Sequence, residues 1–108
     1  MAWSNDVTET LVNAVTSATT GSAVQFRPGR TVNSVRYFIK STSSTTATVD
    51  IQVSYDGTNW AAAISQVSNP GTGVTTGVIS GPVPYIRAVT AGASHGTITV
   101  TAVAQVEA

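Results

Sequence analysis

The only histidine, His95, is the first residue to consider for catalysis. It stands in the short stretch AGASHG, which has no carboxylate near it in the sequence. The partners of a Ser–His–Asp arrangement meet only in space, so the sequence alone leaves such an arrangement open. Polar residues gather in turns, and we therefore interpret His95 as a solvated turn residue.

The chain has five carboxylates, and only two of them, Asp50 and Asp56, suggest a chemical role. Asp50 and Asp56 stand six positions apart, which separates them by about 20 Å along an extended strand, at roughly 3.3 Å per residue. A glycosidase pair needs two carboxyl groups roughly 5 to 9.5 Å apart, so these two residues do not form such a pair within one chain. The oxygens of DGTN (56–59) suit calcium, but the further acidic ligands of a calcium loop are missing. We predict a non-enzyme without catalytic, cofactor-binding or metal-binding residues.

The basic residues and the first tryptophan are candidates for contact with a partner. Arg27 and Arg30 flank a Pro-Gly turn, so they can lie side by side at one end of the domain. They are either ordinary solubilising charges or a contact for an acidic or carbonyl-rich surface, which the five donors of an arginine suit. Trp3 lies in a polar N-terminal segment, and we expect it to dock on its own fold or on a neighbouring subunit.

The second tryptophan, Trp60, follows the turn DGTN and has two interpretations. Because it shares a predicted strand face with Ile64, we favour packing against the core or at its edge. The alternative is an aromatic platform that stacks against a sugar.

Composition restricts the class of protein further. Only 9% of the 108 residues are charged, against roughly 25% in a typical domain, and five acidic residues balance five basic ones. A neutral surface opposes self-association poorly, and it does not suit a protein that binds nucleic acid by neutralising phosphates. The absence of cysteine excludes disulfides and thiol chemistry. We expect no membrane span and, without a secretory signal, synthesis in a cytoplasm without export.

Alternation of apolar and polar residues at period two predicts an all-β protein. Turn residues separate about seven or eight short strands, which favours one antiparallel β-sandwich or jelly-roll-like domain over 10–108, preceded by an N-terminal arm over 1–9. In the strand predicted over 49–55, Val49, Ile51, Val53 and Tyr55 share one face. Further strands are expected over 10–18, 23–26, 31–41, 60–65, 85–90 and 97–106, with a long loop over 66–77 and a hairpin-type turn at AGASHG.

Four stretches together cover nearly the whole chain from Glu9 onward: ETLVNAVTSATTGSAVQFRPGRTVNSVRYFI, ATVDIQVSYDGTNWAA, GPVPYIRAVTA and GTITVTAVA. In these stretches the sequence resembles small virion structural proteins of tailed bacteriophages. The resemblance implies a structural role, as a capsid decoration (cement) protein or as a neck or tail accessory, without catalytic residues.

This resemblance and the composition together predict a decoration protein that is made in the cytoplasm of the bacterial host and assembled on the capsid surface of the virion. It would bind the major capsid protein or other virion proteins as a homo-oligomer, with a trimer as the working hypothesis, through Trp3, Arg27 and Arg30. Two alternatives remain open: a carbohydrate- or receptor-binding module of a tail or fibre that uses Trp60, and a neck or tail structural component.

Overall fold

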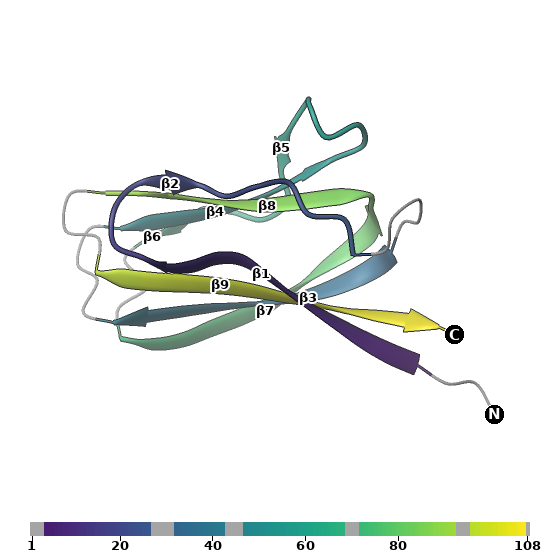
Figure 1. Ribbon diagram of the computed structural model, residues 1–108, viewed down its shortest axis with the longest axis horizontal. Helices are drawn as coiled ribbons and strands as arrows, with labels where there is room; N and C mark the ends of the chain where they lie inside the picture. Colours follow the sequence, from purple (N-terminus) through teal and green to yellow (C-terminus); the bar gives the residue numbers. More distant parts are fainter. Residues whose placement is uncertain (1–3, 27–31, 43–46, 69–71, 93–95, 108) are drawn as a thin grey trace.

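The computed structural model describes residues 4–26, 32–42, 47–68, 72–92 and 96–107, and all the regular elements among them are β-strands. Within these residues no helix is long and apolar enough to span a membrane. The strands form two facing layers (Figure 1). Their bounds are β1 (Ser4–Val15), β2 (Thr19–Thr20), β3 (Val32–Thr42), β4 (Thr48–Ser54), β5 (Ala61–Ala62), β6 (Val67–Ser68), β7 (Gly73–Val83), β8 (Tyr85–Ala91) and β9 (Thr97–Glu107).

The strand order is that of a long antiparallel hairpin folded over on itself. The first sheet has the order β1-β9-β3-β7 and the second β2-β8-β4-β5, with β6 also paired to β4. With β5 and β6 taken as one interrupted strand, the first strand pairs with the last, the second with the last but one, and so on inward. Two four-stranded sheets connected in this way make a jelly roll. The predicted all-β, jelly-roll-like domain is confirmed.

The core lies between the two sheets, where the period-two pattern of each central strand places its apolar residues. Each fully buried Val or Ile side chain contributes roughly 1.5–3 kcal/mol relative to an exposed one. In β4 the buried residues Val49 and Ile51 belong to the predicted face. The other central strands alternate in the same way and bury Val35 and Ile39 in β3, Ile86 and Ala88 in β8, and Ile98, Val100, Ala102 and Ala104 in β9.

The N-terminal strand begins earlier and ends earlier than the predicted range 10–18. Strand β1 pairs with β9 from Ser4, opposite Glu107, and its register shifts twice between Thr10 and Val15. Residues 4–9 of the predicted arm therefore belong to the sheet, whereas residues 1–3 lie outside the described part of the chain. The predicted strand over 23–26 is reduced to a single bridge, Val24 to Ile86, in which each backbone N–H donates to the carbonyl oxygen of the other residue at 2.9 Å.

The prediction of a long loop over 66–77 is wrong, because β6 and half of β7 lie there. The loop was predicted from Asn69, Pro70, Gly71 and Gly73. Gly77, however, has a packing role in the strand. A Cβ at Gly77 would lie only 2.7 Å from Cζ of Tyr37, the residue opposite it on β3. An aromatic ring that covers a glycine on a neighbouring strand stabilises such a pair, and the glycine is needed because the ring occupies the place of its side chain.

The hairpin-type turn predicted at AGASHG is also corrected. Strand β8 belongs to the second sheet and β9 to the first. The connection between them therefore crosses from one layer to the other instead of joining hydrogen-bonded neighbours. The glycines at its two ends, Gly92 and Gly96, both have positive φ, which suits glycine because it lacks a Cβ.

Candidate functional site

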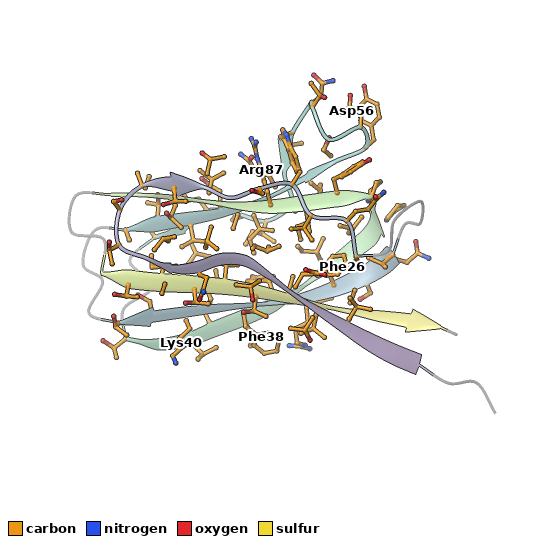
Figure 2. The ribbon with its side chains drawn as sticks, in the orientation of Figure 1. Phe26, Phe38, Lys40, Asp56 and Arg87 are labelled. Atoms are coloured by element: carbon orange, nitrogen blue, oxygen red, sulfur yellow. The ribbon has the colours of Figure 1, made fainter. Side chains whose placement is uncertain are left out.

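The loop between β4 and β5 projects from the end of the second sheet, and Asp56 lies near its tip (Figure 2). Gln52 and Val53 of β4 pair with Ala62 and Ala61 of β5, so the strands predicted on the two sides of DGTN do pair, but the strand expected over 60–65 is reduced to Ala61–Ala62. The turn is wider than DGTN suggests, because six residues, 55–60, separate the two strands.

The carboxylate of Asp56 organises this loop by accepting four hydrogen bonds. The backbone N–H groups of Thr58 and Asn59 donate to Oδ1 at 2.8 Å, and the hydroxyl of Ser54 donates to the same oxygen at 2.9 Å. The Nδ2 of Asn59 donates to Oδ2 at 2.7 Å. These donors, led by the backbone N–H of Asn59, hold the pKa of Asp56 well below its usual range. The side chains of Asp56 and Asn59 are therefore used to hold the turn.

Ser54 supports the loop from beneath. Its side chain is buried, and its Oγ accepts hydrogen bonds from the N–H groups of Asp56 (3.2 Å) and Gly57 (2.8 Å). The alternation of β4 breaks at this point, because Ser54 turns inward while Tyr55 turns out. The predicted place of Tyr55 in the core wall is therefore wrong: the side chain is 76% exposed.

Trp60 closes the loop and is held by the outer face of the second sheet. The guanidinium carbon of Arg87 lies 4.3 Å from the centre of the Trp60 ring, which is a cation–π contact. Arg87 is itself oriented by its Nε, which donates to Oε1 of Gln52 at 2.7 Å, directly across the β4–β8 pairing. The three side chains form a stack that fixes the ring of Trp60 at the surface, outside the core cluster.

An open apolar groove of about 450 Å³ lies beside this tryptophan. Two aromatic rings, two prolines and the end of β4 contribute to its walls. The lining residues are Val53, Ser54, Tyr55, Asn59, Trp60, Ala61, Pro82 and Pro84. The hydroxyl of Ser54 and the Nδ2 of Asn59 are engaged in the hydrogen bonds of the loop. The groove therefore offers mainly flat apolar surface, which suits stacking of a ring or packing of apolar side chains.

The position of Trp60 differs from the prediction that it packs against the core or at its edge, because it lies outside the core cluster and beside the groove. The structure brings Trp60 together with Tyr55 and Arg87, and nothing in the sequence placed Arg87 beside either aromatic residue. One signal was present: Arg87 alternates with the buried Ile86 and Ala88, so it had to face outward from the second sheet. Its position opposite Gln52 depends on the register between β4 and β8, which the sequence does not specify.

The other predicted contact residues, Trp3, Arg27 and Arg30, lie outside the described residues, as does His95.

The segment Gly92–Gly96 contains the sequence pattern Gly-x-Ser-x-Gly, which in hydrolases carries the nucleophilic serine. That motif works on a sharp turn from a strand into a helix, whereas this stretch leads from strand β8 into strand β9. Among the described residues, no group of three His, Cys, Asp or Glu side chains could hold a metal ion.

Comparison with known proteins identifies the fold through solved structures. No family model and no curated protein sequence matches the chain. The crystal structure of YomS, a protein derived from the SPBc2 prophage, superposes with a TM-score of 0.72 at 17% identity, covering 98% of this chain and 97% of that one. The chain thus shares its whole fold with a prophage-derived protein.

Two further structures align with TM-scores too low to support an argument. A crystal structure of PirA gives a TM-score of 0.43 at 14% identity over 95% of this chain and 93% of that one. A structure of the infectious bursal disease virus Gx strain gives 0.36 at 13% identity over 95% of this chain and 32% of that one.

Proposed function

We propose that this protein is a non-enzymatic structural component of a tailed-phage virion, and specifically a decoration protein that binds the outside of the major capsid shell. The observation that carries the proposal is the match of the entire jelly roll to a prophage-derived protein, over 98% of the chain. The neutral, charge-poor composition supports it, because such a surface suits a protein that works in an assembly.

The mechanism is the burial of a rigid domain against the shell at junctions between capsid subunits. A standard interface buries about 1,200–2,000 Å², and repeated attachment of a homo-oligomer multiplies the effect of each contact. Trp3, Arg27 and Arg30 are the proposed contacts: a tryptophan can anchor in a pocket of the partner, and arginines can donate to carboxylates or carbonyl groups on its surface.

The test is the position and copy number of the protein on particles of the phage that encodes it. Heads of a gene-deletion mutant are purified, incubated with the purified protein and imaged by cryo-electron microscopy. Regular density on the outside of expanded heads supports the proposal. Density at the neck or tail alone would instead assign the protein to that structure, and no binding anywhere on the particle would reject a virion role.

Paired substitutions test the proposed contact residues. The variant Arg27→Ala/Arg30→Ala is expected to bind heads at least tenfold more weakly than the wild type. The matched control, Arg36→Ala/Lys40→Ala, removes the same charge from exposed positions of β3. An equal loss of affinity in both variants would show that net charge, and not the arginine-flanked turn, determines attachment.

A second candidate function is recognition of a carbohydrate or receptor, favoured by one observation: Trp60 stands in an open groove beside the exposed Tyr55. The test is calorimetric titration with host polysaccharides. Trp60→Ala is expected to abolish any binding without loss of the far-ultraviolet circular dichroism of the sheets, because Trp60 lies outside the core cluster. Absence of binding by the wild type, or binding that survives Trp60→Ala, would reject this function.

A further inference from the structure

The jelly roll has four sheet edges, and three of them carry features that block pairing with another strand. An open edge presents unpaired backbone N–H and C=O groups, and proteins protect such edges with short strands, charges and bulges. Strand β2 has two residues, and the opposite edge of its sheet is split into β5 and β6 of two residues each. Strand β1 carries Asp6 and Glu9, two register shifts and a residue of positive φ, Ala14.

Strand β7 lacks this protection over most of its length. It forms the outer edge of the first sheet, where it pairs with β3 alone among the described strands (Figure 1). From Gly73 to Ser80 its register with β3 runs through eight consecutive pairs without a shift. Its sequence, GVTTGVISGPV, contains no charged residue. Irregularity is confined to the two ends of the strand: Gly73 and Gly81 have positive φ, and Pro82 lacks an N–H.

The side chains of β7 also favour a partner. Three large hydrophobic residues are exposed in the described part of the chain, and two of them, Val74 (62%) and Val78 (48%), are on this strand. They lie opposite Lys40 and Arg36 of β3, with Thr76 between them opposite Phe38, so all of these side chains share one face of the sheet. Figure 2 shows Lys40 and Phe38 on the outer side of that layer. An apolar strip therefore runs along the edge of the sheet.

We propose that β7 pairs with β7 of a second copy of this chain, antiparallel and about a two-fold axis, to form a continuous eight-stranded sheet from two four-stranded ones. Antiparallel pairing of eight residues supplies roughly eight backbone hydrogen bonds, because alternate residue pairs each exchange two. The valine-bearing strips of the two copies become contiguous on one face of the joined sheet.

Self-pairing is favoured over pairing with a charged partner strand because β7 is neutral and self-complementary. An isologous two-fold contact sets the same residues against each other, and like charges directly opposite on two strands destabilise a pair. In β7 there are none to oppose. The nearest cations, Arg36 and Lys40, would be separated from those of the second copy by three strand spacings, about 14 Å at roughly 4.8 Å each. That distance exceeds the Debye length of about 8 Å at physiological ionic strength.

The double variant Val74→Glu/Val78→Glu tests the pairing. Each new carboxylate faces a basic residue in its own sheet, Lys40 or Arg36, so the fold is retained. In the dimer, four carboxylates would gather at the seam. Sedimentation equilibrium is expected to show a wild-type dimer and a dissociation constant at least tenfold higher for the variant.

The matched control places the same two charges on the opposite edge of the same sheet. Thr10→Glu/Asn13→Glu alters exposed positions of β1 and is expected to change the dissociation constant less than threefold. The proposal is overturned by a monomeric wild type at millimolar concentration, by a trimer or other odd-numbered assembly, by a β7 variant that dimerises like the wild type, or by a control that dissociates equally.

Cysteine cross-linking provides a second measurement that does not depend on the stability of the charged variant. The chain has no cysteine, so any disulfide in a single-cysteine variant must join two copies. Cysteines are placed singly at Val74, Thr76 and Val78, two positions apart, so that one of them falls near the two-fold axis, within the Cα separation of about 4.4–6.8 Å that a disulfide requires. At least one should cross-link tenfold faster than Asn13→Cys. Equal rates for all four variants would overturn the proposal.

Discussion

Two segments that follow one another in the sequence form edges of opposite sheets, and they are built in different ways. In residues 54–68, side chains bind the backbone of their own loop. Ser54 and Asp56 take part in most of the side-chain hydrogen bonds there. The edge strand is broken into β5 and β6. In residues 73–83, Thr, Val and Gly leave the backbone of β7 to pair with β3 on one side and with nothing described on the other.

The difference separates two kinds of binding surface on one small domain. Where side chains satisfy the local backbone, the chain leaves the strand direction and encloses a groove, lined here by Tyr55 and Trp60. Such a surface suits a compact ligand or a protruding side chain. Where the backbone stays regular and unprotected, the surface suits another strand. The second surface is available for assembly with another strand, and the first remains free for a separate contact.

The largest expected effect is on the pairing between β3 and β7, through Gly77→Val. The new side chain would overlap the ring of Tyr37, with its Cβ 2.7 Å from Cζ and 2.8 Å from Cε2. Overpacking of this kind costs typically about 1–3 kcal/mol, measured as the free energy of unfolding in urea. In a Tyr37→Leu background the same substitution should cost less than ~1 kcal/mol. An equal cost in both backgrounds would show that the ring is not the obstacle.

The elements that the sequence predicted correctly are those in which one face is buried from end to end. In β8 and β9 the apolar residues recur at every second position, and the structure buries Ile86, Ile98 and Val100 completely. A one-residue shift would expose the whole face, so the pattern and the fold constrain each other. The general class, an antiparallel sandwich or jelly roll, followed from several such strands separated by turn residues, whereas the strand order came from the structure.

The features that the sequence did not predict depend on contacts between residues far apart in the sequence. Gly77 reads as a loop residue until Tyr37 is placed opposite it. Tyr55 continues the alternation of β4, and only the hydrogen bonds of Ser54 to the following turn show that the pattern ends one residue earlier. The groove could not be predicted, because Pro82 and Pro84 reach Trp60 only through the pairing of β8 with β4.

The next effect in size tests the other edge, through Ser54→Ala. The substitution leaves the N–H groups of Asp56 and Gly57 without their common acceptor. An unsatisfied donor in a part-buried position costs about 1–2 kcal/mol, so the free energy of unfolding should fall by that amount. The control Ser65→Ala, at an exposed position, should change it by less than about 0.5 kcal/mol. An equal loss in both variants would contradict the role assigned to Ser54.

A smaller effect is expected from Arg87→Lys, which tests whether the Trp60 ring is held from the sheet. Lysine keeps the charge but loses the planar guanidinium that stacks on Trp60 and the Nε–H that donates to Gln52. A cation–π contact at an exposed site contributes about 0.5–1 kcal/mol. The variant should therefore lose no more than that, while the fluorescence anisotropy of Trp60 falls in a Trp3→Phe background that leaves one tryptophan. Unchanged anisotropy would mean that the loop alone fixes the ring.

The smallest effect concerns pH and distinguishes the two edges, because only the loop edge depends on a carboxylate. The pKa of Asp56 in the folded protein lies below its ordinary value of about 4, since the N–H groups of Asn59 and Thr58 donate to the charged form. A lowered folded-state pKa adds stability above the ordinary pKa, and that stability is lost as the pH falls toward the folded-state value. Wild type should therefore exceed Asp56→Asn in urea midpoint at pH 7, and the difference should shrink as the pH is lowered from 5 to 2. A difference that stayed constant over this range would show that the hydrogen bonds of the loop do not require the charge.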